Sequence, residues 1–395
     1  MNRKQRRAQG QEKRKTGHGA PAASDPVALH EAGIEAYRAG RLTAAADLIG
    51  QAIAASGPVP EFHYNLAIVL KAMGRLKDAA ASYERAIALK PDHVNAHNNL
   101  GNVWKALGQT DKARASFVQA LTYNPDNTDT HYSLGVLCGE LGEKDQAERH
   151  FRRCLARDPH DSRGAGILLA HLGLGDTPER TPDAQLLSLY DVRSRFWDQE
   201  VSYFAPQLVA NGLRRHAPPT RLDILDIGCG TGLVGASVRD LATRLDGVDL
   251  SPAMLEKANA KAVYDTLFQA DLAAFMAGHT GSYDAVLAAA TLIHFGDLKG
   301  LFQAVAGSLR ARGLFVFTLF PDETDAGPGY AVAASTRLAQ SGCFRHSIPY
   351  LTLLAAETGF GVLELEKTIH EHDQNDKPVA GLLAVLRRNS AIGPK

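Results

Sequence analysis

Residues 222–235 read L-D-I-L-D-I-G-C-G-T-G-L-V-G, and this stretch restricts the possible folds more than any other part of the chain. An apolar run ends in an acid, Asp226, and an apolar pattern with helical spacing resumes at Leu233. Between them, glycine occupies every second position, at Gly228, Gly230 and Gly232. The pattern predicts a buried strand, a tight turn and the start of a helix, so that a ligand can lie directly against the backbone of the turn.

The spacing of these glycines fits two kinds of ligand. The glycines up to Gly235 also satisfy the G-x-G-x-x-G pattern of dinucleotide binding, with Asp249 about where that pattern places a ribose-binding acid. However, Asp226 precedes the glycines, where a carboxylate would repel a pyrophosphate and attract an ammonium group. A further acid, Asp271, follows another strand-like run. Acids at the ends of three successive strands suit a ligand with a cationic end, a ribose and an adenine amine, and S-adenosylmethionine is such a ligand.

The segment D-I-G-C-G-T-G resembles motif I of the class I S-adenosylmethionine-dependent methyltransferases. The resemblance implies that Asp226 and the turn at 228–232 hold the methionine part of the cofactor. It also implies that Asp249 binds the ribose hydroxyls, and that Asp271 lies at the adenine. The full set of cofactor-binding residues implied in this way is Asp226, Gly228, Cys229, Gly230, Gly232, Asp249, Leu250, Met254, Asp271 and Leu272.

The N-terminal half of the chain repeats itself with a period of 34 residues. The period is marked by Gly40, Gly74, Gly108 and Gly142 and by Ala45, Ala79, Ala113 and Ala147. A 34-residue period with a glycine between two amphipathic helices is the tetratricopeptide pattern. It predicts four repeats, at 26–59, 60–93, 94–127 and 128–161, followed by a capping helix and linker at 162–185.

The rest of the chain, over 186–388, alternates between strand-like and helix-like runs. Strands are predicted at 222–227, 244–249, 266–270, 283–289, 313–320, 361–369 and 379–387. Such alternation indicates a largely parallel sheet with helices on both faces. It looks like the Rossmann-like seven-stranded methyltransferase sheet, so the predicted fold class is an α-solenoid followed by this α/β domain. A helix over 186–213, broken at Pro206, precedes the first strand.

The predicted solenoid offers a groove for a partner. In tetratricopeptide proteins the first helix of each repeat lines the concave face, and the groove residues predicted here are Asn65, Asn98, Asn99, Asn102 and Lys105. A primary amide can both donate to and accept from one peptide unit, so stacked asparagines could hold an extended protein segment. The alternative is a generic groove in which these asparagines have no such role.

Candidate catalytic residues follow the fourth predicted strand, because ligands of open parallel sheets lie outside the carboxyl ends of the strands. They are His294 and Asp297. His294 could take a proton from a hydroxyl or an amine, and the alternative is a histidine that only packs in its loop. The stretches G-V-D-L-S-P-A-M-L-E-K-A and H-S-I-P-Y resemble bacterial predicted methyltransferases that carry tetratricopeptide repeats. Where that group has an acid near the end of the fourth strand, this chain has Ala290 and Thr291.

The roles of an aromatic segment and of the repeats are left open by the sequence. The aromatic residues Tyr190, Trp197 and Tyr203 precede the first strand, where they would either close over the cofactor or form a seam between domains. The sequence does not disclose the acceptor. The repeats either recruit a protein partner or substrate, or only assemble an enzyme that acts on small molecules. A scaffold without catalytic activity is the third possibility.

Charge and cysteine usage bound the setting of the protein. The 43 basic and 43 acidic residues cancel, so no overall field favours nucleic acid. Residues 1–15 carry seven basic side chains and one acid, and the tail at 1–25 is predicted to be disordered, with contact to nucleic acid or an anionic surface as the alternative. A second short tail is expected at 389–395. No secretory signal or membrane span is predicted, and the four cysteines lack metal-binding spacing. We therefore expect a cytoplasmic protein with reduced thiols and no metal.

Overall fold

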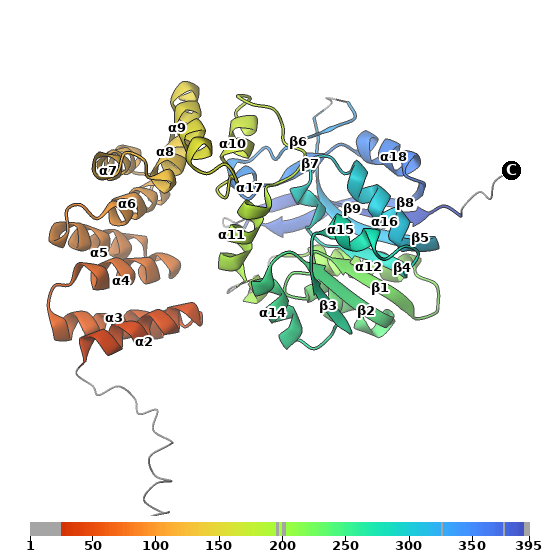
Figure 1. The fold of residues 1–395 in the computed structure, drawn as a ribbon, viewed down its shortest axis with the longest axis horizontal. Helices are drawn as coiled ribbons and strands as arrows, with labels where there is room; N and C mark the ends of the chain where they lie inside the picture. Colours follow the sequence, from red (N-terminus) through yellow and green to blue (C-terminus); the bar gives the residue numbers. More distant parts are fainter. Residues whose placement is uncertain (1–24, 195–196, 200–202, 325–326, 374–375, 391–395) are drawn as a thin grey trace, which may run out of the picture. The chain divides into compact units, whose positions relative to one another are not determined.

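The computed structural model describes residues 25–194, 197–199, 203–324, 327–373 and 376–390 (Figure 1). The chain divides into two compact units, residues 1–133 and 134–395, and the division falls inside helix α8 (Thr128–Glu140). The basic tail, apart from its last residue, and most of the C-terminal tail lie outside the described residues. The domain boundaries expected at residues 161 and 185 stay predictions.

Paired helices make up the first unit, as the repeat pattern predicts. The pairs are α2 (Pro26–Arg38) with α3 (Leu42–Ser56), α4 (Pro60–Ala72) with α5 (Leu76–Leu89), and α6 (Val94–Ala106) with α7 (Thr110–Tyr123). The glycine that marks the period follows the first helix of each pair, and its φ is +74° at Gly40, +74° at Gly74 and +72° at Gly108. Glycine adopts this left-handed conformation without a steric penalty, which explains why the period is marked by this residue.

The core of the first unit depends on small residues that face large ones. Gly101 in α6 packs against the Phe117 ring of α7, and a Cβ atom added at Gly101 would lie 2.5 Å from that ring. Gly33 faces Ile49 in the same way, with 2.6 Å to the nearest carbon. Phe117 and Ile49 are fully buried. The helices of a pair can therefore approach closely only because one of them lacks a side chain at the contact.

This packing predicts opposite effects for two glycines that both lie inside helices. Gly101→Ala should lower the free energy of unfolding by about 1–3 kcal/mol, because the new methyl group overpacks the Phe117 contact. Gly50→Ala should raise it by about 0.5–1 kcal/mol, because no atom lies within 4 Å of the added Cβ and alanine favours the helix. Urea denaturation followed by circular dichroism measures both changes. Equal effects of the two substitutions would contradict the packing argument.

The second unit begins with helices that continue the repeat pattern. After α8 come α9 (Lys144–Arg157) and the short α10 (Ala165–His171). α10 contacts α9 and also α17 (Thr336–Gln340), which belongs to the α/β part of the unit. His171 Nδ1 hydrogen-bonds the Ala333 carbonyl oxygen over 3.1 Å, so the end of α10 is fixed to the α/β part by a polar contact as well.

A mixed sheet forms the centre of this unit (Figure 1). Its strands are β1 (Leu222–Ile227), β2 (Ala242–Asp249), β3 (Thr266–Gln269), β4 (Tyr283–Ala288), β5 (Leu309–Pro321), β6 (Tyr330–Val332), β7 (Phe344–His346), β8 (Phe360–His372) and β9 (Pro378–Arg388). β3, β2, β1, β4 and β5 are parallel in that order, and β9 and then β8 add antiparallel strands. These are the seven expected strands. β7 pairs with the carboxyl end of β5, and β6 pairs with β7. The sequence did not indicate these two short strands.

Helices cover both faces of the sheet. Besides α17, the α-helices before and between the strands are α11 (Asp183–Arg193), α12 (Ala205–His216), α13 (Leu233–Val238), α14 (Pro252–Ala260), α15 (Leu272–Ala277), α16 (Lys299–Ser308) and α18 (Ile348–Glu357). Ile224 packs in one core with α12 and α13, whereas Leu225 packs in another with α15, α16 and α18. Alternate residues of a strand face opposite sides, so two apolar cores are expected. The helix predicted over 186–213 is two helices, and Pro206 lies in the first turn of α12, where proline is tolerated.

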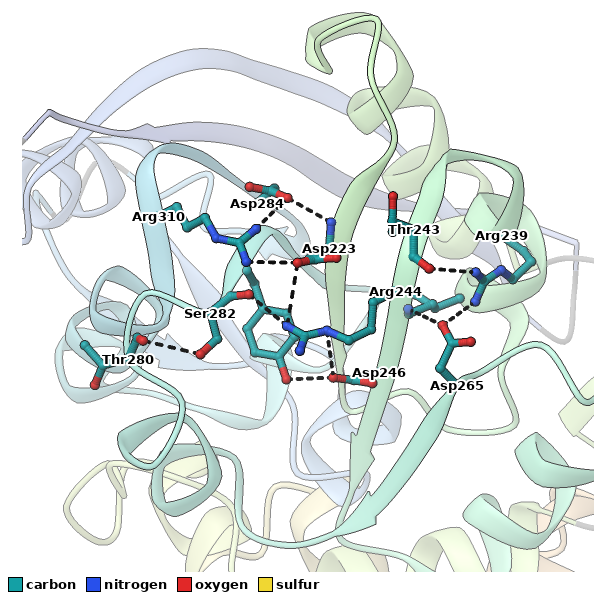
Figure 2. Close-up of polar contacts among 12 residues, drawn as sticks. Asp223, Arg239, Thr243, Arg244, Asp246, Asp265, Thr280, Ser282, Asp284 and Arg310 are labelled. Carbon is teal, nitrogen blue, oxygen red and sulfur yellow. Dashed lines mark hydrogen bonds and ion pairs between the residues drawn. The ribbon is translucent and has the colours of Figure 1, made fainter.

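Charged side chains connect the amino ends of four strands (Figure 2). Arg310 on β5 pairs with Asp223 on β1 at 2.9 Å and with Asp284 on β4 at 2.8 Å. On β2, Arg244 pairs with Asp246 at 3.5 Å. The Tyr283 hydroxyl of β4 donates to Asp246 over 3.0 Å. The charged side chains at the amino ends of these strands are thus engaged with one another. A ligand site is therefore expected at the carboxyl ends of the strands.

Two absences concern the described residues alone. No helix among them is long and apolar enough to cross a membrane. Within the same ranges, no cluster of three or more histidine, cysteine or acidic side chains could hold a metal ion.

Candidate functional site

A cleft of about 1000 Å³, including its open mouth, lies at the carboxyl ends of β1, β2, β3 and β4. Most of the residues predicted from the sequence line it, namely Gly228, Cys229, Gly230, Asp249, Leu250, Met254, Asp271, Leu272 and His294. Three predicted residues are not in the lining: Asp226, Gly232 and Asp297. The structure therefore brings together side chains from four separate strand ends. It also divides the predicted set into cleft residues and supporting residues.

The glycine turn is fixed to the end of the neighbouring strand. The backbone N–H groups of Gly228 and Cys229 both donate to the Val248 carbonyl oxygen, at 2.8 and 3.1 Å. The Gly230 N–H donates to Asp249 Oδ2 over 2.9 Å. Gly230 has a φ of +53°, and no atom lies within 4 Å of a Cβ built there. A side chain at this position would enter open space in the cleft, so glycine keeps the backbone accessible to a ligand.

Asp249 is held in place by backbone donors. Its Oδ1 accepts the Ser251 N–H at 2.8 Å, and its Oδ2 accepts the Gly230 N–H. Burial raises the pKa of Asp249, while these hydrogen bonds work in the opposite direction. Each carboxylate oxygen has further lone pairs. A pair of vicinal hydroxyls, as in a ribose, therefore matches the acceptors that Asp249 offers to the cleft.

Asp271 occupies the start of α15 and one side of the cleft. Its Oδ1 accepts the N–H groups of Ala273 and Ala274, and its Oδ2 pairs with Arg180 at 3.2 Å. Arg180 also pairs with Asp183 and lines the cleft. The sequence did not single out Arg180, because the glycine- and proline-rich stretch around it indicated only a linker. Contacts from this stretch to Asp271 arise from the tertiary fold.

Asp226 lies behind the glycine turn, fully buried. Its Oδ2 accepts a hydrogen bond of 2.7 Å from the Tyr264 hydroxyl, and its Oδ1 has no partner among the described residues. Burial raises the pKa of Asp226 to about 7, with a smaller contribution from the charge of Asp249. Tyr264 also lies against Gly232, whose φ is +88°. Contact of Asp226 and Gly232 with the methionine part of the cofactor stays a prediction.

The two candidate catalytic residues have different surroundings. His294, at the end of a short 3-10 helix (Leu292–His294), is buried at the wall of the cleft. Its Nε2 lies 2.6 Å from the Tyr190 hydroxyl. Asp297 is exposed, accepts the Lys299 N–H at 2.8 Å and receives a hydrogen bond of 3.0 Å from the Tyr350 hydroxyl. The structure does not bring Asp297 to the cleft.

Aromatic side chains from the segment before β1 cover part of the cleft. Tyr190, Trp197 and Tyr203 all line it. Their rings pack edge to face, with centroids 5.9 Å apart for Tyr190 and Trp197 and 5.3 Å apart for Trp197 and Tyr203. Asp198, next to Trp197, accepts hydrogen bonds of 2.5 Å from the Thr231 hydroxyl and the Lys261 ammonium. The aromatic segment is therefore fixed to the glycine turn.

The buried Asp226 predicts an unusual dependence of stability on pH. Its pKa is about 7 in the folded protein and about 3.8 when unfolded, so between these values the folded state alone holds the proton. Wild-type stability should then fall, relative to Asp226→Asn, by roughly 3 kcal/mol between pH 4 and pH 7. Denaturation of both proteins across this range measures the difference.

Asp265→Asn serves as the matched control. The exposed ion pair with Arg239 lowers the pKa of Asp265, so its contribution to stability is lost as the pH falls rather than as it rises. Parallel stability curves for the wild type and Asp226→Asn would show that Asp226 does not titrate in this way.

Comparisons with known proteins match both parts of the chain. A methyltransferase domain model matches residues 224–313, which include the glycine turn, Asp249, Asp271 and His294. A TPR repeat model matches residues 69–108, and a tetratricopeptide repeat model matches residues 105–172.

Curated relatives agree with the methyltransferase model. Methyltransferase-like protein 27 of Homo sapiens is 41% identical over 114 residues, which are 27% of this chain and 46% of that protein. A ubiquinone biosynthesis O-methyltransferase of Xanthomonas oryzae pv. oryzae is 31% identical over 160 residues, 37% of this chain and 64% of that protein. This chain thus spans between about half and two thirds of these two relatives.

Among solved structures, the Burkholderia thailandensis 1,6-didemethyltoxoflavin-N1-methyltransferase with bound 1,6-didemethyltoxoflavin and S-adenosylhomocysteine is similar over 54% of this chain and 93% of its own. The TM-score is 0.44 and the sequence identity 18%. The models and the curated relatives bear out the resemblances noted in the sequence. The chain combines tetratricopeptide repeats with a class I methyltransferase domain.

Proposed function

We propose that this protein transfers a methyl group from S-adenosylmethionine to an acceptor that enters the cleft beside His294. The observation that carries the proposal is the glycine turn, which is hydrogen-bonded to the end of β2 beside Asp249 and leaves its backbone open to the cleft. When bound, the cofactor supplies a methyl group on a positively charged sulfur, which is an excellent leaving group.

The chain's own residues would bind the cofactor, orient the two reactants and exclude water from the cleft. Asp249 accepts hydrogen bonds from the ribose hydroxyls, and the Gly230 backbone lies against the cofactor. Leu250, Met254 and Leu272 form the apolar lining on the adenine side. Asp271, which lies between β3 and α15, is on the same side. Tyr190, Trp197 and Tyr203 also line the cleft. Holding two reactants aligned in a site shielded from water accounts for several kcal/mol of the barrier in such displacements.

The repeats recruit a protein partner or substrate in this proposal. Asn65 Nδ2 lies 2.9 Å from His30 Nε2, and Asn99 Nδ2 donates to the Tyr64 hydroxyl over 3.1 Å. Both bonds join the first helices of consecutive repeats, and each uses one of the two amide protons. The asparagines are therefore aligned along successive helices at a repeat spacing, with polar capacity left for a peptide backbone.

The other predicted groove residues differ in their surroundings. Asn102 Nδ2 donates to Ser133 Oγ over 3.4 Å, whereas Asn98 is buried and its Oδ1 has no partner among the described residues. Lys105 lies in the last turn of α6. A small-molecule enzyme whose repeats serve only for assembly is the second candidate. Labelled cofactor incubated with cell extract distinguishes the two, because the label enters macromolecules in the first case and small metabolites in the second.

Asp249→Asn should weaken binding of S-adenosylmethionine by about tenfold to a hundredfold, because the ribose loses a charged acceptor. Isothermal titration calorimetry measures the dissociation constant. Asp240→Asn is the control, since Asp240 lies in the same domain, pairs with Arg214 and is 64% exposed. Cofactor affinity that is equal in Asp249→Asn and the wild type would contradict the assignment of the ribose site.

The double substitution Asn65→Ala with Asn99→Ala should reduce co-purification of a protein partner at least tenfold. Because both residues also bond between repeats, thermal unfolding of the variant must be measured in parallel. Gly101→Ala provides the control, since it destabilises the same unit without removing an amide. Unchanged recovery of every partner by the double variant would argue against the asparagine groove.

A further inference from the structure

Two side chains at one end of the cleft form a hydrogen-bonded pair. Tyr190 on α11 and His294 after β4 both line the cleft. The Tyr190 Oη atom lies 2.6 Å from His294 Nε2, and the two rings are nearly perpendicular, with centroids 5.6 Å apart. β4 lies next to β1 on the side away from β2 and β3. The pair is thus on the opposite side of the glycine turn from the ribose and adenine residues, where an acceptor would approach.

The direction of this hydrogen bond follows from the other ring nitrogen. His294 Nδ1 lies 3.1 Å from the Gly342 carbonyl oxygen, which can only accept, so Nδ1 carries a proton. Burial, with a smaller contribution from the charge of Arg193, lowers the pKa of His294 to about 4, so the ring is neutral at ordinary pH. Nε2 therefore has a free lone pair, and the Tyr190 hydroxyl donates to it. The Tyr190 oxygen keeps its own lone pairs for a donor in the cleft.

Charged side chains of the described lining are already engaged. Arg180 pairs with both Asp183 and Asp271, and Asp249 accepts two backbone N–H groups. The lining also includes the apolar or aromatic residues Leu186, Leu187, Trp197, Tyr203 and Phe295. The hydroxyls of Thr181 and Thr291, which line the cleft too, donate to backbone carbonyl oxygens of the fold. Such a lining suits an uncharged, flat molecule.

We infer that Tyr190 and His294 form a proton relay for an uncharged acceptor that bears an aromatic hydroxyl group. The inference rests on the proposed function, because it names the acceptor class and the base of the same site. The acceptor hydroxyl donates to Tyr190 Oη, which replaces the proton that it passes to His294 Nε2.

In this step the acceptor O–H bond breaks and its electron pair forms the new O–CH₃ bond. The pair of the broken C–S bond stays on sulfur, so the sulfonium becomes a neutral thioether. The proton that is released ends on His294, which becomes an imidazolium. One positive charge is lost at sulfur as one appears on the histidine, so the cleft keeps its net charge. A histidine that is too weak a base to charge by itself can therefore accept the proton during the transfer.

Several charged or titratable groups act on the pair from the elements packed around it. Arg193, on the same helix as Tyr190, donates to Ser341 Oγ over 2.9 Å. Burial raises the pKa of Tyr190, and the nearby groups Cys343, Asp249 and Glu371 raise it further, whereas Arg193 lowers it. Tyr190 thus keeps its proton at neutral pH and transfers one only as it receives another.

The first test needs no cofactor or acceptor. Nitrogen-15 spectra of histidine-labelled protein should show His294 neutral from pH 5 to pH 8, with the proton on Nδ1. In Tyr190→Phe the Nε2 signal should shift, because its donor is lost, while Nδ1 stays protonated. A proton on Nε2, or an imidazolium at pH 6, would overturn the relay whatever the enzyme methylates.

The second test compares phenol, which is protonated at neutral pH, with 4-nitrophenol, which ionises readily. The assay follows transfer of a labelled methyl group from S-adenosylmethionine. Tyr190→Phe and His294→Gln should lower kcat for phenol by about a hundredfold and for 4-nitrophenol by less than about tenfold. Turnover of phenol by Tyr190→Phe should recover as the pH rises, because an acceptor that is already ionised needs no relay.

Tyr350→Phe is the matched control, because it removes another half-buried tyrosine hydroxyl with two hydrogen bonds outside the cleft lining. Calorimetry separates the possible failures. A wild-type protein that does not bind S-adenosylmethionine refutes the proposed function. Binding without methylation of either phenol refutes the acceptor class alone. Equal losses for both phenols, or none, refute the relay and leave the proposed function standing.

Discussion

The hydrogen bonds between the glycine turn and the end of β2 are the contacts on which the rest of the site depends. Two N–H groups of the turn share the Val248 carbonyl oxygen, and a third binds Asp249. These bonds fix the separation of the β1 and β2 ends and the orientation of the Asp249 carboxylate. Behind them, the Tyr264 hydroxyl donates to Asp226, and the Tyr264 ring lies against Gly232 of the turn. The turn therefore has its binding conformation before the ligand arrives, so binding costs little conformational entropy.

The amino ends and the carboxyl ends of the parallel strands have different roles. At the amino ends, Arg310 and Arg244 form ion pairs with acids of β1, β2 and β4, so these side chains are engaged within the fold. At the carboxyl ends, the glycine turn, three acidic residues (Asp183, Asp249 and Asp271) and several aromatic side chains line the cleft. A cleft shielded from water is suited to a reaction that moves a single positive charge, because the charge interacts more strongly with its neighbours there than in water. The Tyr190–His294 pair belongs to this environment.

Secondary structure was predictable where local signals were strong. The seven main strands lie within a few residues of their predicted ranges, because each is an apolar run bounded by turn residues. β6 and β7 were missed, since each spans only three residues and shows no periodicity. Pro206 was taken as a break in one helix and instead lies in the first turn of another. A proline marks a boundary in either case, and the sequence does not say on which side of it the helix lies.

The sequence by itself determined the repeat, the sheet and the cofactor motif, because periodicity and the glycine turn are local properties of the chain. Only the tertiary structure decided which neighbouring side chains share the cleft. His294 and Asp297 are three residues apart, and the turn after β4 brings one to the wall of the cleft and leaves the other exposed. Tyr190 and Arg180 reach the cleft from a distant segment. Their contacts with His294 and Asp271 come from packing between elements, which no local pattern of residues encodes.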